Sequence, residues 1–289
     1  MPALTPFVSS PLAHWNALLS EAAEFLPLTG LDPDRYAAGH ASFEARSTQR
    51  ALLIDWLKDR LARRAGDLSM LSVGCGDGVV DAELARAAVA FGRTVRYAGL
   101  DPHPASAGRF LASVGDVDGV LASATVGGAE QVASEQSYDV VLCVHSLYYV
   151  DDLPATLLRL WRLVRPGGEL LVVLAPLGEL NALTAALAPP VDGRRQWWSA
   201  DLADALVEVG LDAEQQSLHG TLSLEDCFDS DDEQGRLTVD FAVQAVLTDA
   251  LRDRVLEHLL AVRLPGPGLS IDHPVDIWTM RGPRAAEPA

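Results

Sequence analysis

Short apolar runs alternate with segments of helical periodicity through the middle of the chain. The runs lie at Met70 to Val73, Val95 to Leu100, Val120 to Val126, Asp139 to Val144 and Glu169 to Leu174. Apolar runs of this length between helices are typical of strands that are buried on both faces of a mostly parallel sheet. Short crossovers favour an open, doubly wound α/β sheet whose ligands bind beyond the carboxyl ends of the strands.

The flanks of this region have mainly helical periodicity. Apolar spacing, capping residues and breakers predict helices at 11–25, 35–44, 48–65, 178–187 and 199–209, and two more within 236–263. A last strand is predicted from Val275 to Met280. The Pro- and Ala-rich segment 283–289 is expected to be a disordered tail.

Charge and composition narrow the class of protein. The 289 residues include 40 acidic and 22 basic side chains, so the formal charge is −18, which disfavours nucleic-acid and anionic membrane surfaces as partners. The longest apolar run is too short to span a bilayer, and the first thirty residues lack the Lys and Arg of a secretory signal. Three scattered cysteines predict neither a disulfide framework nor a zinc site. We therefore expect a cytoplasmic globular protein, and the single lysine in an Ala-rich chain is typical of a bacterial source.

The sharpest local feature is a glycine-rich turn, in which Gly74, Gly76 and Gly78 follow the first predicted strand and precede a helix. Without Cβ atoms, such a turn lets a ligand lie against backbone amides at a helix N-terminus. Asp101 ends the next strand, 23 residues beyond Gly78, where a carboxylate can bind a ribose diol or cap a helix. The G-x-G-x-G spacing differs from the dinucleotide G-x-G-x-x-G pattern and favours a nucleoside without a pyrophosphate.

Two later motifs complete a family pattern. A fourth strand opens into His145, and an Arg165-Pro166-Gly167-Gly168 turn precedes the fifth. From Leu71 to Val173 the sequence resembles the class I S-adenosylmethionine-dependent methyltransferases. The resemblance implies a Rossmann-like, seven-stranded, mostly parallel sheet with helices on both faces and an antiparallel last strand. One departure is Ser72, because many members have an acid there, which puts one contact to the methionine end of the cofactor in doubt.

Within that superfamily the chain also looks like the histamine N-methyltransferase group. The similar stretches include Ser47-Thr48, Leu147 to Val150 with Asp152 to Leu157, and Leu224 to Phe228 with Asp240-Phe241. The family's glutamate after the Ser-Thr pair is replaced by Gln49 here. Loss of that carboxylate removes the partner of a buried ammonium, so histamine itself is disfavoured and a less basic aromatic is expected.

The expected site residues follow from these motifs and this resemblance. For S-adenosylmethionine, with S-adenosylhomocysteine as product, they are Gly74, Cys75, Gly76, Gly78, Asp101, Pro102, Val144 and His145. For the substrate they are Tyr36, Phe43, Gln49, His145, Tyr148, Tyr149 and His273. His145 is the candidate general base, since its ordinary pKa near 6.5 suits proton removal at neutral pH. A packed or hydrogen-bonding role for His145 stays open.

The acidic stretch from Glu225 to Asp240 is expected to be a solvated loop. It lacks a calcium loop's glycine at position six, where Gln234 stands, so no metal is predicted. The domain prediction is a helical lid (1–65), a cofactor-binding core (66–176), the rest of the sheet with substrate-capping insertions (177–282) and the tail (283–289).

The predicted function is methyl transfer to nitrogen of an imidazole, indole or alkaloid-type small molecule by a monomer or homodimer. Methyl transfer to carbon of an electron-rich ring is the alternative. A non-catalytic binding protein and an NAD(P)-dependent oxidoreductase also stay open.

Overall fold

The computed structural model describes residues 11–131, 137–191, 193 and 196–282. The predicted tail at 283–289 lies outside the described residues. The chain divides into two compact units, each assembled from three separate segments. The first unit comprises Met1–Gln49, Leu177–Arg195 and His219–Pro274, and the second comprises Arg50–Pro176, Gln196–Leu218 and Val275–Ala289. No helix in the described ranges is both long and apolar enough to cross a membrane.

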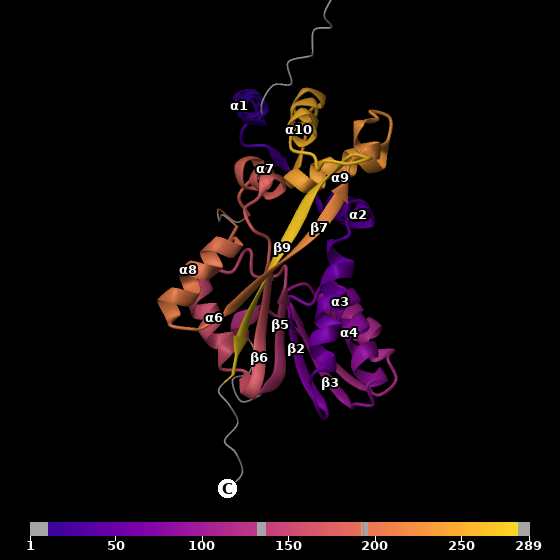
Figure 1. Cartoon of the computed structure of the whole chain (residues 1–289), viewed down its shortest axis with the longest axis vertical. Coiled ribbons are helices and arrows are strands. Elements are labelled where there is room, and N and C mark those ends of the chain that lie inside the picture. Colours follow the sequence, from indigo (N-terminus) through magenta and orange to yellow (C-terminus); the bar gives the residue numbers. More distant parts are fainter. Residues whose placement is uncertain (1–10, 132–136, 192, 194–195, 283–289) are drawn as a thin grey trace, which may run out of the picture. The chain divides into compact units, whose positions relative to one another are not determined.

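A seven-stranded sheet is formed within the described residues, in the order β4-β3-β2-β5-β6-β9-β7 (Figure 1). Its strands are β2 (Leu68–Val73), β3 (Val95–Asp101), β4 (Val120–Val126), β5 (Tyr138–Val144), β6 (Val164–Leu174), β7 (Glu214–Ser223) and β9 (Ser270–Arg281). The strands β2 to β6 pair in parallel, whereas β9 runs antiparallel to β6. The predicted mostly parallel sheet with an antiparallel last strand is therefore confirmed.

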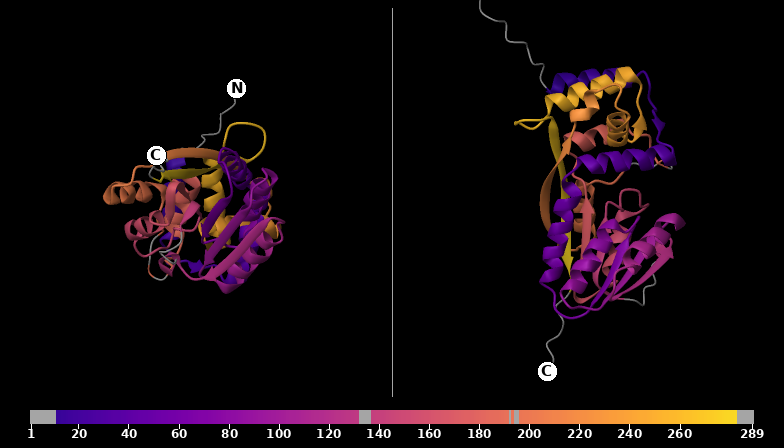
Figure 2. Two further views of the ribbon diagram at one scale, coloured as in Figure 1. Left: turned by 90° about the horizontal axis from the view of Figure 1, so that it is seen from below. Right: turned by 90° about the vertical axis from the view of Figure 1, so that its right-hand side faces the viewer.

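Helices cover both faces of the sheet in the second unit, as Figures 1 and 2 show. One face packs against α3 (Gln49–Ala62), α4 (Val79–Ala90) and α5 (Pro104–Gly115), and the other against α6 (Leu153–Trp161) and α8 (Ser199–Val209). All six residues of β2 are buried because this central strand is covered on both sides. The carboxyl ends of the parallel strands lie on the same side of the sheet. The glycine turn follows β2 on this side.

The first unit is mainly helical and has its own hydrophobic core. Its elements are α1 (Pro11–Ala22), α2 (Pro33–Arg46), α7 (Glu179–Leu187), α9 (Glu233–Val243), α10 (Asp249–Ala261) and the short antiparallel pair β1 (Thr29–Gly30) and β8 (Ala245–Val246). The core includes Leu18, Phe43, Leu183, Val243 and Leu259. Two 3-10 turns complete the elements, η1 (Ala129–Gln131) in the second unit and η2 (Glu225–Phe228) in the first.

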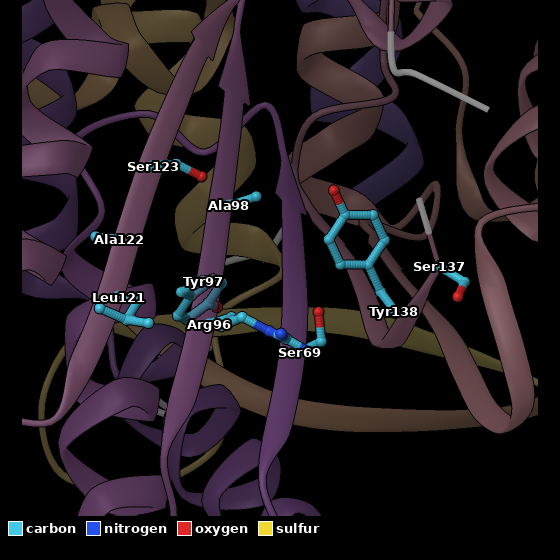
Figure 3. Close-up of a pocket in the computed structure, with 9 residues that line it drawn as sticks. All are labelled: Ser69, Arg96, Tyr97, Ala98, Leu121, Ala122, Ser123, Ser137 and Tyr138. Carbon is cyan, nitrogen blue, oxygen red and sulfur yellow. The ribbon is translucent and has the colours of Figure 1, made fainter. Parts of the chain in front are cut away.

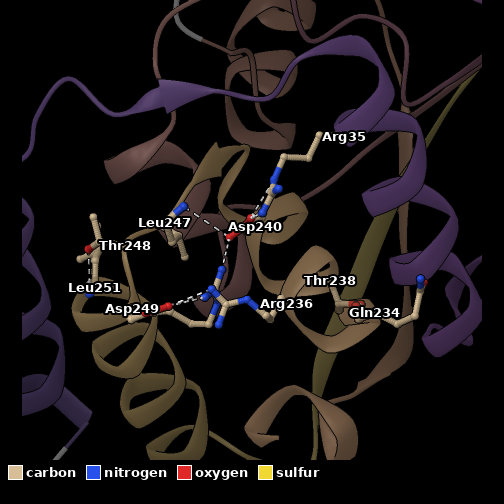
Figure 4. A network of polar contacts seen from close by, with 10 residues as sticks. Arg35, Gln234, Arg236, Thr238, Asp240, Leu247, Thr248, Asp249 and Leu251 are labelled. Atoms are coloured by element: carbon tan, nitrogen blue, oxygen red, sulfur yellow. Dashed lines mark hydrogen bonds and ion pairs between the residues drawn. The ribbon is translucent and has the colours of Figure 1, made fainter. Parts of the chain in front are cut away.

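The acidic stretch contradicts the prediction of a solvated loop. Most of its second half is the helix α9, and Asp240 is completely buried. The Asp240 carboxylate accepts a hydrogen bond from Arg35 Nε at 3.0 Å (Figure 4). It accepts another from Arg252 Nη2 at 2.9 Å. A buried carboxylate is stable only when it is paired in this way, so Asp240 ties α2, α9 and α10 together.

Candidate active site

The glycine turn after β2 is shaped by backbone conformation and close packing. Gly74, Gly76 and Gly78 have φ of 67°, 56° and 73°, a region that side-chain-bearing residues rarely adopt. A Cβ on Gly74 would lie 2.2 Å from the Cβ of Ser146, and one on Gly78 would lie 2.9 Å from the Cα of Phe110. A Cβ on Gly76 would meet no atom within 4 Å. The turn therefore packs tightly at its two ends and leaves open space at its middle glycine.

Asp101, at the end of β3, is bonded directly to this turn. Its Oδ2 accepts the Gly76 amide at 2.9 Å, and its Oδ1 accepts the His103 amide at 2.9 Å. The amides of Gly74 and Cys75 donate to the carbonyl oxygen of Leu100 at 2.7 Å and 3.0 Å. These amides thus hold the turn in place, which differs from the expectation that they face a ligand. What the turn offers a ligand is space beside a carboxylate.

These groups fit the nucleoside cofactor that the sequence implies. Each Asp101 oxygen accepts one hydrogen bond from the backbone and keeps a second lone pair for a hydroxyl of a ribose diol. Beside Gly74, the buried Ser146 Oγ has no hydrogen-bond partner among the described residues. Sequence reasoning missed Ser146, although its position directly after His145 at the end of β5 could have indicated it. Pro102 is exposed and Val144 is half-buried at the ends of β3 and β5.

His145 directly follows β5 and is held in an unusual backbone conformation with φ of 50°. Its Nδ1 lies 2.8 Å from the hydroxyl oxygen of Tyr148, and the two rings stack with centroids 6.0 Å apart. The same oxygen accepts the Ala175 amide at 3.1 Å. A phenol that accepts this amide can donate its own hydrogen to Nδ1, which places the imidazole hydrogen on Nε2.

Aromatic side chains continue from this pair. The ring of Tyr148 meets the rings of Tyr149 and Trp198 edge-on, with centroids 6.4 Å and 5.9 Å away. Gln196 donates a hydrogen bond to the Tyr149 hydroxyl, and burial raises the pKa of Tyr149. Edge-on contacts of this kind fix the orientation of a ring. His145 itself is exposed at the end of this aromatic cluster.

A second cluster lies in the first unit, around Gln49. Its Nε2 donates to the carbonyl oxygens of His273 at 3.1 Å and Pro274 at 3.0 Å. Ser47 Oγ accepts the Gln49 amide at 3.1 Å and lies 2.7 Å from His273 Nδ1, so its hydroxyl can donate to that nitrogen. Burial lowers the pKa of His273 to about 4, and the ring is therefore neutral at pH 7. Both hydrogens of the Gln49 amide group are used within the protein.

The aromatic residues that were predicted on one helical face lie on α2, and each of them contacts the ring of Phe241. The Phe241 ring centroid lies 5.3 Å from that of Tyr36, 5.4 Å from that of His40 and 5.1 Å from that of Phe43. Phe43 in turn meets the His273 ring edge-on at 5.0 Å. Tyr36 keeps 47% of its surface exposed, whereas Phe43 belongs to the hydrophobic core.

The predicted site residues therefore fall into two sets. The second unit holds Gly74, Cys75, Gly76, Gly78, Asp101, Pro102, Val144, His145, Tyr148 and Tyr149. The first unit holds Tyr36, Phe43, Gln49 and His273. The structure brings Asp101 to the glycine turn, His145 to Tyr148, and Gln49 to His273.

A hollow of about 490 Å³ lies elsewhere on the second unit (Figure 3). Its lining includes Ser69, Arg96, Leu121 and Tyr138, which stand at the beginnings of their strands. Ligands of open α/β sheets bind at the opposite, carboxyl ends. This hollow is therefore separate from the candidate site.

Comparisons with known proteins agree with this geometry. A family model for a methyltransferase domain matches residues 45–216. Histamine N-methyltransferase of Bos taurus is 23% identical over 242 residues, which cover 74% of this chain and 81% of the bovine protein. Ubiquinone biosynthesis O-methyltransferase of Aeromonas salmonicida is 30% identical over 162 residues, or 54% of this chain and 62% of that protein.

Solved structures share the fold at low sequence identity. A Bacillus halodurans protein provisionally described as a methyltransferase matches with a TM-score of 0.54 and 18% identity, covering 80% of this chain and 98% of its own. The YcgJ protein from Bacillus subtilis matches with a TM-score of 0.52 and 15% identity, covering 82% and 98%. At these identities the likeness concerns the fold alone.

Proposed function

Because the chain belongs to the S-adenosylmethionine-dependent methyltransferases, we propose that it transfers a methyl group to nitrogen of a nitrogen-containing aromatic small molecule. The proposed substrate class comprises imidazole, indole and alkaloid-type compounds. The family assignment identifies the chain as an enzyme. It excludes an NAD(P)-dependent oxidoreductase and a non-catalytic binding protein. The proposal concerns the acceptor.

The observation that carries the proposal is the aromatic cluster that ends at the exposed His145. A flat acceptor ring can stack or pack edge-on against Tyr148 and its neighbours, which would orient the attacking atom. Similarity to a histamine N-methyltransferase over 74% of the chain supports a nitrogen acceptor.

When bound, S-adenosylmethionine supplies an electrophilic methyl group on a positively charged sulfur. The chain's task is to hold the acceptor in line with that methyl carbon in a site that excludes water. A neutral ring nitrogen with a lone pair needs no base to attack. A base is needed where a ring N–H proton must leave after the new bond has formed.

The hydrogen bond to Tyr148 determines which nitrogen of His145 can act as that base. With the imidazole hydrogen on Nε2, that nitrogen is a donor and orients an acceptor atom of the substrate. To receive a proton at Nε2, His145 must place its hydrogen on Nδ1 and donate it to the Tyr148 oxygen. We propose that Tyr148 positions His145 and couples these two states.

The geometry around Gln49 supports the exclusion of a strongly cationic acceptor. A carboxylate at this position would face the carbonyl oxygens of His273 and Pro274, to which Gln49 donates. The local backbone thus favours an amide and disfavours the acid that would bind an ammonium. A neutral or weakly basic ring fits this arrangement better than histamine does.

Methyl transfer to ring carbon is the second candidate. Attack from carbon of an indole-type ring requires loss of a ring proton, for which His145 is the available base near β5.

The test is an acceptor panel of imidazoles, indoles, histamine and catechols, incubated with the enzyme and S-adenosylmethionine and analysed by mass spectrometry. We expect a methylated product from a weakly basic ring and little or none from histamine. Products from catechols or other hydroxylated rings alone would overturn the proposal.

A further inference from the structure

Asp276 is a buried carboxylate in the last strand of the sheet, outside the predicted site. It lies in β9 opposite Leu174 of the neighbouring strand β6 (Figure 1), and 4% of its surface is exposed. Its Oδ2 accepts hydrogen bonds from the Ser199 hydroxyl at 2.6 Å and from Gln215 Nε2 at 2.9 Å. Its Oδ1 accepts one from the Ser217 hydroxyl at 2.6 Å. Hydrogen bonds to a carboxylate are short and strong, so Asp276 holds these side chains in fixed positions.

Ser199 is the first residue of α8 and connects this carboxylate to the end of β6. Its hydroxyl oxygen accepts a hydrogen bond from Trp278 Nε1 at 2.8 Å, and its hydroxyl hydrogen goes to Asp276. Its backbone amide donates to the carbonyl oxygen of Ala175, the residue directly after β6, at 3.1 Å. The side chain of Ser199 is thus anchored on β9, while its backbone holds Ala175.

The residues held by Ser199 or next to it contact Tyr148 from different sides. The Ala175 amide donates to the Tyr148 hydroxyl oxygen at 3.1 Å. The Trp197 amide donates to the Tyr148 carbonyl oxygen at 2.9 Å, and the Trp198 ring meets the Tyr148 ring edge-on with centroids 5.9 Å apart. The backbone, ring and hydroxyl of Tyr148 are therefore all fixed by this segment.

Tyr148 connects the anchored segment to His145. Its hydroxyl oxygen lies 2.8 Å from His145 Nδ1. A hydrogen bond weakens steeply when its length or angle departs from the favoured range, so a shift of this hydroxyl changes both the hydrogen at Nδ1 and the direction of the ring. The path of hydrogen bonds from Asp276 to His145 passes in order through Ser199, Ala175 and Tyr148.

We propose that Asp276 is a positioning residue for methyl transfer: through Ser199, it holds the Tyr148 hydroxyl where it hydrogen-bonds to His145. The inference deepens the proposed function and rests on the role proposed there for His145. Loss of the Asp276 contact should lower kcat and leave the affinity for S-adenosylhomocysteine nearly unchanged, because the glycine turn and Asp101 are not part of this path.

The two serines that donate to Asp276 supply a variant and its control. Ser199→Ala and Ser217→Ala each remove one hydroxyl and one hydrogen bond of 2.6 Å to this carboxylate, but the path to Tyr148 runs through Ser199. We expect Ser199→Ala to lower kcat by roughly five- to twentyfold, since a small misplacement of a catalytic group reduces the rate by a large factor. Ser217→Ala should keep a kcat close to that of the wild type. An unchanged kcat in Ser199→Ala, or an equal loss in both variants, would overturn the proposal.

A double-mutant cycle separates positioning from a general loss of structure. Tyr148→Phe removes the hydroxyl through which Ser199 acts, so Ser199→Ala added to Tyr148→Phe should lower kcat little further. A merely structural effect would multiply the two losses, which would contradict the proposal. Thermal unfolding of each variant fixes an assay temperature at which all are folded. If Ser199→Ala does not fold, Asp276→Asn takes its place, because it keeps the size of the side chain and weakens the same bonds.

A measurement on the imidazole itself needs no turnover, so it distinguishes failure of this inference from failure of the proposed function. The ¹⁵N NMR signal of His145 Nδ1 in the cofactor-free protein is assigned by its loss in His145→Ala. It should shift in Ser199→Ala and keep its position in Ser217→Ala. An unchanged signal in Ser199→Ala would overturn the inference even where the acceptor panel yields a product. A shifted signal would support the hydrogen-bonded path even where the panel yields none and the proposed function fails.

Discussion

Replacement of Gln49 by glutamate tests whether the local structure, or only the substrate, dictates the amide at this position. Gln49 is 4% exposed, and its Nε2 donates to the carbonyl oxygens of His273 and Pro274. In Gln49→Glu the NH2 group that donates both hydrogen bonds is replaced by a carboxylate oxygen, which can only accept hydrogen bonds at neutral pH. The new carboxylate then points at two carbonyl oxygens, so it is both buried and repelled.

The magnitude follows from these contacts. Two lost hydrogen bonds of about 1 kcal/mol each, together with an unpaired buried charge, should lower the free energy of unfolding by about 3–5 kcal/mol at pH 8. Burial raises the pKa of the new glutamate, so the folded state binds more protons than the unfolded state. Stability therefore falls as pH rises above about 4.3. At pH 5 the protonated side chain regains one donor, and the loss should shrink to about 1–2 kcal/mol.

The assay is chemical unfolding of the wild type and Gln49→Glu at pH 5 and pH 8. Gln234→Glu is the matched control, since it makes the same change at an exposed position of α9 and should alter stability by less than about 0.5 kcal/mol. Gln49→Glu as stable as the wild type at pH 8 would refute the reasoning.

Three further substitutions test the site. Asp101→Ala should weaken S-adenosylhomocysteine binding at least tenfold in calorimetry, and unchanged binding would refute the ribose assignment. His145→Ala should lower kcat by about 10²-fold or more with little change in cofactor affinity, and unchanged turnover would reduce His145 to a packing residue. Gly74→Ala places a Cβ 2.2 Å from that of Ser146 and should abolish cofactor binding, whereas Gly108→Ala, with no atom within 4 Å, should leave it intact. Equal binding by the two glycine variants would contradict the packing argument.

The parallel core could be predicted because its central strands β2, β5 and β6 are buried along most of their length, although β4 at the edge of the sheet is largely exposed or half-buried. Continuous apolar runs placed β2 to β6 within a few residues of their observed bounds, although β6 begins earlier, at Val164. The strand β7 was not predicted. Its first residues, Glu214 to Ser217, are polar and exposed, since β7 is an edge strand, and a polar edge strand has no apolar run to indicate it.

Side-chain pairing was harder to predict than strand order. The spacing of the glycines and Asp101 indicated that they would meet, because both follow strands that end at the same edge of the sheet. The burial of Asp240 could not be inferred, since its partner Arg35 is 205 residues away and its own neighbourhood is acidic. Ser146 was missed because its packing against Gly74 joins the ends of two different strands, although its position directly after His145 could have indicated it.

The most direct test of the proposed function is the position of the transferred methyl group. The enzyme should be supplied with S-adenosylmethionine labelled with ¹³C in the methyl group and with the best acceptor of the panel, and the product examined by NMR. We predict that the label couples to protons and carbons across a ring nitrogen, as an N-methyl group does. A label bonded to oxygen would contradict nitrogen methylation of an aromatic ring. A label bonded to ring carbon would also contradict it and would support the second candidate, methyl transfer to ring carbon.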